Sequence, residues 1–426
     1  MLRVCHLGKY YPPAPGGMES HIQTIARSQA ALGVDVQVVC VNHADRHGRE
    51  IVWSRHGANH TNVENDGGVR VTRVARSASM ARLDLCPSLP RLLASIESKG
   101  VDVFHLHTPN PTMLLALCML RPSTPIVITH HSDVVRQKIL KYAMRPFELF
   151  VYQRAAGIQA TSPFYPAASD VLPRFREKVT SLPMGIDLEA YLRPSAGAQK
   201  HAAELRAKHG RPLWLCVGRC VYYKNFRTSV EAMAHVPGRL LIIGHGPEEA
   251  HLRQLAQQFG VQDRIIWQSY ATNDELVGAY HAATALWFPS NARSEAFGLV
   301  QVEAMASGCP VINSHIPGSG VPWVSLHEHT GLTVPIDDVD NFSKAAWRLL
   351  SEPGFRERLS RNARTRAVEQ FDQSVMAKRS LSIYRRAMDN GFVSTRSIQD
   401  WAQPVYEQRK VVPIEEEEIA EQTLAM

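Results

Sequence analysis

The chain repeats one pattern twice, because short apolar segments alternate with helical patterns from residue 2 to about 188 and again from 213 onward. The first repeat begins with an apolar segment at 2–7, a helical pattern that ends at Gly33, and an apolar segment at 34–41. Strands linked by helices over units this short predict parallel sheets. Residues 189–211 are polar, with one short helical pattern at 202–208, and we expect them to form a linker. The sequence therefore predicts an α/β protein with two doubly wound, Rossmann-like domains.

Further apolar segments extend both expected sheets, and residues 42–68 between them are polar enough to predict a surface excursion. We also expect Asn273 to cap a helix and Asp338 to cap another, rather than to bind metal with Asp340. Ligands of doubly wound sheets bind beyond the carboxyl ends of the strands, so the expected site is a cleft between the two domains. The predicted strands are 69–74, 101–106, 126–129, 158–160 and 179–182 in the first domain, and 213–217, 239–243, 264–268, 285–289 and 310–313 in the second.

The net charge of +7 lies entirely in the first half of the chain. Residues 1–188 hold 21 Lys and Arg against 14 Asp and Glu, whereas the two kinds balance in the remainder. An anionic partner for the first half is therefore expected. The absence of a basic run interleaved with aromatic residues argues against nucleic acid, and a diffuse excess fits an anionic membrane surface or a phosphorylated substrate.

The seven cysteines have no metal-type spacing, which indicates reduced thiols in a cytosolic protein. The N-terminus runs directly into a strand, so no signal peptide is expected. The longest nearly unbroken apolar run, residues 113–120, is far shorter than the ~20 residues that a membrane-spanning helix needs.

Two carboxylates in the segment 295–303 are the strongest candidates for chemistry. Glu295 precedes a predicted helix at 298–307, whose first backbone N–H groups, from Phe297, Gly298, Leu299 and Val300, can bind an anion. Glu303 lies further along that helix, where a carboxylate can bind a vicinal diol such as a ribose. The alternative remains open that Glu295 only caps the helix and Glu303 is a solvated surface residue.

Segment 294–312 resembles the E-x7-E block of the retaining GT-B glycosyltransferases of family 4. Five further segments match motifs of that family in the same order, and the resemblance covers residues 1–390. They are Gly16-Gly17-Met18-Glu19, the site of His131, residues 183–187, Val217-Gly218-Arg219 with Lys224, and the turn Gly244-His245-Gly246-Pro247. Taken singly, these are ordinary features: glycine turns, surface charges and a structural histidine at a strand end.

The resemblance implies a role for each matching residue. Arg219 and Lys224 would hold the donor diphosphate, where negative charge develops as the glycosidic bond breaks. Glu303 would bind the donor ribose, Glu295 the transferred sugar, and His131 a sugar hydroxyl or the forming bond. The main chain would contact the donor directly at eight further positions, several of them glycines that carry no side chain in the way. They are Gly16, Gly17, Gly244, Gly246, Phe297, Gly298, Leu299 and Val300. The family resemblance also implies retention of configuration without a protein nucleophile, the leaving phosphate taking the acceptor proton, and no metal or other cofactor.

The domains implied are an acceptor domain at 1–188, a nucleotide-sugar donor domain at 189–372, a helix at 373–390 that returns to the first domain, and an irregular acidic tail at 391–426. Residues 134–154 mix basic and apolar side chains, so this segment either lies on an anionic bilayer or packs as an amphipathic helix on its own sheet. Both alternatives stay open.

The implied reaction transfers a hexose, with mannose slightly preferred, from a GDP- or UDP-linked donor to an acceptor. That acceptor is expected to be a polyprenyl-diphosphate-linked saccharide of lipopolysaccharide or exopolysaccharide synthesis, at the inner face of the cell membrane. The alternatives are a GT-B-like epimerase or phosphorylase and a non-catalytic nucleotide-sugar-binding protein. A nicotinamide dehydrogenase is disfavoured because no G-x-G-x-x-G follows the first strand.

Overall fold

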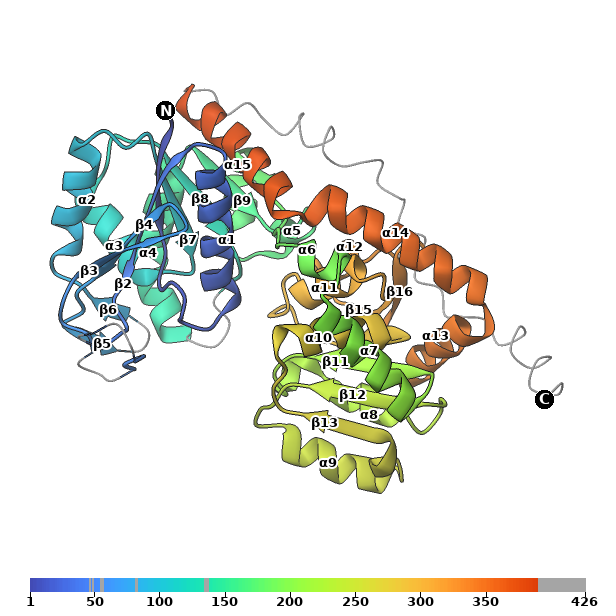
Figure 1. The fold of residues 1–426 in the computed structure, drawn as a ribbon. Helices are drawn as coiled ribbons and strands as arrows, with labels where there is room; N and C mark the ends of the chain where they lie inside the picture. Colours follow the sequence, from blue (N-terminus) through green and yellow to red (C-terminus); the bar gives the residue numbers. More distant parts are fainter. Residues whose placement is uncertain (46, 48–49, 54–56, 81–82, 134–137, 390–426) are drawn as a thin grey trace. The chain divides into compact units, whose positions relative to one another are not determined.

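The computed structural model describes residues 1–389 apart from 46, 48–49, 54–56, 81–82 and 134–137 (Figure 1). The chain divides into two compact units. The first unit holds Met1–Asp187 and the segment that begins at Gln370, and the second holds Leu188–Glu369. The expected acidic tail, 391–426, lies outside the described residues.

The first unit is built on an eight-stranded sheet in the order β10-β9-β8-β7-β1-β2-β4-β3. Every neighbouring pair is parallel except β3 with β4. Within the expected surface excursion at 42–68 the chain forms β3, which pairs with β4 at the sheet edge. The strands are β1 (Arg3–Leu7), β2 (Asp35–Val41), β3 (Asn62–Asp66), β4 (Val69–Val74), β7 (Val103–Thr108), β8 (Ile126–His130), β9 (Gly157–Ala160) and β10 (Val179–Ser181), with a separate hairpin of β5 (Ala78–Met80) and β6 (Leu83–Leu85).

The last described helix returns to the first unit, as expected. Helix α15 (Gln373–Met388) packs beside α1 (Gly17–Ala31), and both appear together along one side of the first unit in Figure 1. Ile22 and Ile25 of α1 share one buried core with Met376 and Tyr384 of α15. The remaining helices are α2 (Leu89–Ser98), α3 (Pro111–Leu120), α4 (Lys138–Arg154), α5 (Tyr165–Ala168) and the 3-10 segment η1 (Leu172–Lys178).

The second unit has a six-stranded sheet in the order β13-β12-β11-β14-β15-β16, with every pair parallel. Its central strands are fully buried, and Trp214 of β11 stacks on Trp287 of β14 with ring centroids 4.9 Å apart. The α/β class with two parallel sheets is therefore confirmed. The strands are β11 (Leu213–Val217), β12 (Arg239–Ile243), β13 (Ile265–Gln268), β14 (Ala285–Phe288), β15 (Val311–His315) and β16 (Gly331–Pro335).

The helix expected at 202–208 is present but longer, as α7 (Ala196–His209), and because α7 packs on α10 (Asn273–Ala282) inside the second unit the segment 189–211 is not a mere linker. Ala198, Ala202 and Leu205 supply its buried face. The cap of α10 is also one residue earlier than expected, since Thr272 forms a capping box with Glu275. Asp338 does cap α13, accepting from the Asn341 N–H. The other helices are α6 (Glu189–Leu192), η2 (Tyr222–Lys224), α8 (Phe226–Ala232), α9 (Glu249–Gln258), η3 (Gln262–Arg264), α11 (Leu299–Ala306), α12 (Val321–Val324), α13 (Val339–Ser351) and α14 (Pro353–Phe371).

Candidate active site

Lys224 and Glu295 form an ion pair at the carboxyl ends of the central strands of the second sheet. Lys224 ends η2, which follows β11, and Glu295 lies in the segment between β14 and α11. The Lys224 Nζ is 2.6 Å from Glu295 Oε2, and the two side chains are 12% and 11% exposed. Ser290 Oγ donates to the same carboxylate oxygen at 3.2 Å. Glu295 is therefore a paired carboxylate rather than a helix cap, and Lys224 is not a surface charge.

Glu303 lies on α11 close enough to Lys224 for the two charges to interact. Tyr280 of α10 donates its hydroxyl to Glu303 Oε2 at 2.7 Å and so orients the carboxylate. Loss of hydration raises the pKa of Glu303, while the Tyr280 hydrogen bond and the Lys224 charge act in the opposite direction. The structure thus pairs Lys224 with Glu295, and the Lys224 charge also acts on Glu303.

Phe288, which the sequence did not single out, organises this region. The last residue of β14, it places its ring 4.8 Å from the Lys224 Nζ, on the ring face. Gly298 caps α11 with a φ of 79°, and a Cβ on it would lie 2.6 Å from Phe288 Cζ. Glycine is required there by both the backbone conformation and the ring. The start of α11 is therefore fixed against the same aromatic side chain that lines Lys224.

The other residues that the resemblance placed at the start of α11 differ in exposure. Phe297 is buried, whereas Leu299 and Val300 are partly exposed. The first N–H groups of an α-helix have no acceptor within the helix. The first turn of α11, which begins four residues after Glu295, therefore offers backbone donors.

Gly244 and Gly246 pack against the chain that follows β11. A Cβ on Gly244 would lie 2.0 Å from the Gly218 carbonyl oxygen, and one on Gly246 would lie 2.3 Å from that of Cys220. Cys220 N–H also donates to the His245 carbonyl at 3.0 Å. This backbone packing alone accounts for both glycines, and it holds the loop that carries Arg219 and Lys224.

Arg219 is exposed, directly after Gly218 at the end of β11. A Cβ on Gly218 would lie 3.3 Å from Lys224 Cε, so the loop brings the backbone at 218 against the Lys224 side chain. The two cations expected at the donor diphosphate therefore belong to one short loop, with Lys224 ordered by Glu295 and Arg219 at the surface.

Gly16 and Gly17 open helix α1 in the first unit, and they differ in surroundings. The Glu19 side chain folds back over Gly16, where a Cβ would lie 2.1 Å from Glu19 Oε2. A Cβ on Gly17 would meet nothing within 4 Å. Loss of hydration raises the pKa of Glu19. Gly16 is thus required by a neighbouring side chain, while Gly17 lies at an open face of the helix start.

His131 directly follows β8 in the first unit and belongs to a cluster that sequence reasoning did not find. His131 is 8% exposed, and its Nε2 forms a hydrogen bond of 3.2 Å with Nδ1 of His107. Burial, followed by the charges of His21 and His130, lowers the pKa of His131 well below its ordinary value, so the imidazole is neutral at pH 7. The neighbouring His130 is not part of this cluster, and its Nδ1 forms a hydrogen bond of 2.7 Å with the Tyr152 hydroxyl.

A chain of hydrogen bonds sets which ring nitrogen of His131 carries its proton. Ser380 donates to the Ala377 carbonyl at 2.7 Å, so its Oγ accepts from Gln29 Nε2 at 2.8 Å. Gln29 Oε1 is then an acceptor, and it receives the Nε2–H of His6 at 2.8 Å.

The proton positions along the rest of the chain, from His6 to His131, follow in the same way. His6 Nδ1 must accept from His107 Nε2–H at 3.0 Å, which leaves His107 Nδ1 as the acceptor for His131 Nε2–H. Helix α15 therefore fixes His131 as the Nε2–H tautomer, with the lone pair on Nδ1. The sequence signal for part of this cluster was the alternation of His105 and His107, which puts both on one face of a strand. The pairing of β1 with β7 then sets His6 beside His105.

Comparison with known proteins identifies the family. The family model for glycosyl transferases group 1 matches residues 198–366, and the model for Glycosyltransferase Family 4 matches residues 15–190. The chain belongs to glycosyltransferase family 4. It is 29% identical to D-rhamnosyltransferase WbpZ of Pseudomonas aeruginosa over 371 residues, which cover 87% of this chain and 92% of that protein. It is 26% identical to O-antigen chain mannosyltransferase C of Escherichia coli, over 91% of this chain and all of that one.

Solved structures support the GT-B fold that the sequence predicts. Sucrose-phosphate synthase from Thermosynechococcus elongatus superposes with a TM-score of 0.71 at 24% identity, over 92% of this chain and 100% of that chain. HepE from Anabaena, solved in complex with UDP, superposes with a TM-score of 0.68 at 16% identity, over 89% of this chain and 99% of that chain. The family 4 glycosyltransferase therefore has the expected two-sheet fold. Within its described residues, no helix combines the length and apolar character needed to cross a bilayer.

Proposed function

We propose that this glycosyltransferase is a retaining hexosyltransferase that uses a nucleotide-diphosphate sugar and needs no metal or other cofactor. The observation that carries the proposal is the Lys224–Glu295 ion pair at the carboxyl ends of one parallel sheet, with Glu303 within the influence of the same lysine charge. A cation paired with one carboxylate and acting on a second suits a donor whose central diphosphate is flanked by the hydroxyl groups of a sugar and of a ribose.

The second unit is the donor unit in this proposal. Lys224 and Arg219 bind the diphosphate, and the first turn of α11 adds backbone donors where charge develops on the leaving group. Glu295 accepts from hydroxyls of the transferred sugar. Glu303, oriented by Tyr280, accepts from the ribose hydroxyls. Lys224 exchanges part of its contact with Glu295 for a phosphate oxygen when the donor binds.

The first unit supplies the acceptor side. His131, neutral and fixed as one tautomer, hydrogen-bonds the sugar, and the leaving phosphate takes the acceptor proton without a protein nucleophile. Gly17 leaves an open face at the start of α1 for a phosphate. Mannose is the preferred sugar, supported by relatives named as an O-antigen chain mannosyltransferase and a phosphatidyl-myo-inositol mannosyltransferase.

The acceptor in this proposal is a polyprenyl-diphosphate-linked saccharide at the inner, cytoplasmic face of the cell membrane. Helix α4 supports a membrane-facing surface. Its Tyr142, Phe147 and Phe150 are 75%, 40% and 37% exposed, and Met119 of the adjacent α3 is 73% exposed. Val151 and Tyr152 of the same helix are buried. Both sequence alternatives therefore have support, since one face of α4 packs inward and the other presents aromatic side chains.

Basic side chains accompany those aromatic residues. Arg121 and Arg154 lie 5.5 and 5.9 Å from the Phe150 ring, as guanidinium carbon to ring centroid. Aromatic side chains flanked by arginines are the composition that binds an anionic bilayer surface.

Nucleotide binding and product stereochemistry test the proposal. GDP is expected to raise the melting temperature of the purified protein more than UDP, and EDTA should leave that rise unchanged. With GDP-mannose and a membrane lipid extract, the product should carry an α-mannosyl linkage, which NMR of the released saccharide reads. Donor binding without hydrolysis or transfer would favour a non-catalytic binding protein, and conversion of the donor sugar without transfer would favour an epimerase.

A further inference from the structure

Five histidines of the first unit lie in one cluster, which we call the histidine cluster. All five are at most 8% exposed, and each ring lies within 6 Å of at least one other, with centroids 4.3 Å apart for His105 and His107 and 5.0 Å apart for His21 and His131. Neutral imidazoles are the commonest protein ligands of transition metals. The members are His6 of β1, His21 of α1, His105 and His107 of β7, and His131 after β8.

Two triads within the cluster bring their nitrogens within 4.8 Å of one another, but they differ in how those nitrogens are used. In the first, His6, His105 and His107, hydrogen bonds already occupy the rings. His6 contacts Gln29 and His107, and His105 contacts Tyr384 and Thr129. This triad is satisfied as it stands.

The second triad, His21, His107 and His131, is not satisfied. Both ring nitrogens of His21 are buried and have no hydrogen-bond partner among the described residues. A buried polar group without a partner destabilises the folded chain, because it has lost its hydrogen bonds to water. His21 is only 3% exposed, and its ring lies edge-on to His107 and His131, with centroids 5.8 and 5.0 Å away. The unpartnered nitrogens therefore lie beside two further imidazoles.

Geometry and the surrounding hydrogen bonds both suit a metal ion. His107 Nδ1 and His131 Nε2 are 3.2 Å apart. Two ligands of a tetrahedral ion, each about 2.0–2.1 Å from the metal, lie about 3.3 Å from each other. A metal-binding histidine normally donates its other N–H to an outer partner, and His107 does so to His6, which donates in turn to Gln29.

We propose that His21, His107 and His131 form a site for a divalent transition metal of the zinc and cobalt class. His107 binds through Nδ1, which is already a lone pair in the hydrogen-bond chain. His131 moves its ring proton from Nε2 to Nδ1 so that Nε2 faces the metal, and no net proton is released. The fourth position takes a water molecule, as in three-histidine zinc sites.

Occupation of this site removes His131 from hydrogen bonding with sugar, so the metal inhibits transfer. That consequence rests on the proposed function, whereas metal binding itself does not. Sugar transfer therefore proceeds when a chelator removes free metal ions. Zinc inhibits transfer because it competes with the sugar for the His131 imidazole.

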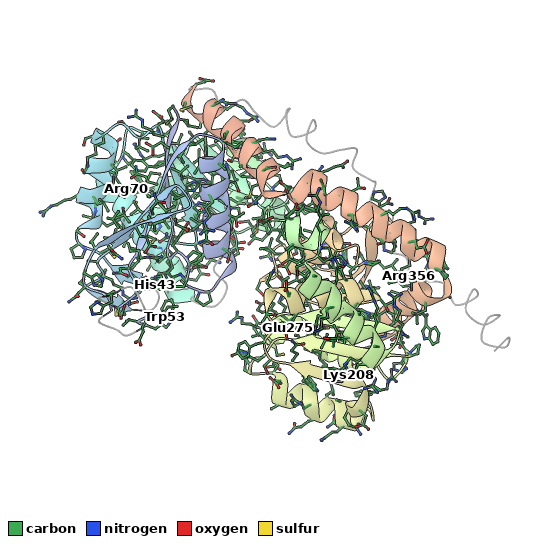
Figure 2. The ribbon with its side chains drawn as sticks, viewed as in Figure 1. His43, Trp53, Arg70, Lys208, Glu275 and Arg356 are labelled. Atoms are coloured by element: carbon green, nitrogen blue, oxygen red, sulfur yellow. The ribbon has the colours of Figure 1, made fainter. Side chains whose placement is uncertain are left out.

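Cobalt binding tests the site directly. Chelator-treated protein is titrated with Co²⁺, and we expect one equivalent to give the visible absorption of a tetrahedral complex. His21→Phe keeps a ring of similar volume without nitrogens and should weaken Co²⁺ binding at least about 100-fold. His43→Phe is the matched control, because His43 is a buried histidine of the same unit that stacks on Trp53 outside the cluster (Figure 2). It should bind like the unchanged protein.

Anomalous diffraction at the zinc edge, from zinc-soaked crystals of the unchanged protein, locates the ion even if His21→Phe folds poorly. Density between His21, His107 and His131 supports the site. Absence of the cobalt band, equal binding by His21→Phe, or zinc only on surface histidines would overturn it. Cobalt binding that depends on His21, in a protein that transfers no sugar, would uphold the site and reject the proposed function.

Discussion

The Lys224 ammonium lies 2.6 Å from Glu295 Oε2 and 4.8 Å from the centre of the Phe288 ring, in a largely buried setting. A nearly buried ion pair adds little net stability, because desolvation of both charges offsets their attraction. In the proposed function the pair holds the lysine in one orientation before the donor binds. Pre-organised cations of this kind are most effective where negative charge develops in a transition state.

Lys224→Ala should lower kcat by about 10²–10³-fold, because in the proposed function it removes the cation that stabilises the leaving diphosphate. Steady-state transfer or donor hydrolysis measures this effect. Lys208→Ala is the control, since Lys208 is an exposed lysine of α7 in the same unit (Figure 2). Equal kcat values for Lys224→Ala and Lys208→Ala would contradict the assignment of Lys224 to the leaving group.

Glu303→Gln should weaken donor binding by roughly tenfold to a hundredfold, because hydrogen bonds to a charged carboxylate are stronger than those to a neutral amide. Isothermal titration with the nucleotide measures this loss. The Tyr280 hydroxyl can still donate to the new amide oxygen, so the side chain should stay in place. Unchanged affinity would remove Glu303 from the ribose site.

The same substitution should change how stability depends on pH. Burial raises the pKa of Glu303, so the folded chain holds its proton in a range where the unfolded chain has lost it. The free energy of unfolding contributed by Glu303 therefore falls as pH rises above the ordinary glutamate pKa. Glu303→Gln should remove that fall and be more stable than the unchanged protein at pH 7, by urea unfolding.

Glu275 provides a contrast of opposite sign. Hydrogen bonds from the Thr272 backbone and hydroxyl lower the pKa of Glu275, so its contribution is present at neutral pH and is lost as pH falls. Glu275→Gln should therefore be less stable than the unchanged protein at pH 7, and the difference should shrink in acid. A matching sign for the two variants would contradict the effect assigned to burial of Glu303.

Apolar runs bounded by glycine were enough to predict most strands, because a parallel strand buried on both faces needs continuous apolar residues. Strand β3 lacked that signal. Asn62–Asp66 is an antiparallel edge strand with polar residues and a half-exposed pattern. Helix α7 was judged by its polarity, although Ala198, Ala202 and Leu205 recur at helical spacing. Alanines at helical spacing indicate a buried helix face less clearly than leucines and valines do, because alanine is only weakly apolar.

The candidate site was predictable only as a set of residue types. Spacing along 295–303 indicated two useful carboxylates, but the pairing of Glu295 with Lys224 depends on how β11 and β14 lie side by side. The histidine cluster depends in the same way on the register of β1 with β7 and on α15 returning to α1. Contacts between residues distant in sequence are set by tertiary packing, which no local pattern reports.

The exposed aromatic face of α4 should bind anionic vesicles. Tyr142→Ser with Phe147→Ser should weaken binding to phosphatidylglycerol vesicles about tenfold or more, because each aromatic loses apolar area that the bilayer would bury. Vesicle co-sedimentation at low and high salt measures this. Val368→Ser is the control, since Val368 is an exposed apolar residue of α14 in the second unit. Equal losses for both variants would show that α4 has no special part in membrane binding.

Gln29→Leu should release the tautomer of His131 without touching it. The variant removes the acceptor of His6 Nε2–H, so either ring proton arrangement becomes available along His6, His107 and His131. Neutron diffraction should show His131 as the Nε2–H form in the unchanged protein and a mixture in Gln29→Leu, with kcat reduced and the donor KM unchanged. Gln29→Glu keeps an acceptor for His6 and should restore most of kcat. A fixed Nε2–H tautomer in Gln29→Leu, or a change in donor KM alone, would contradict a positioning role for Gln29.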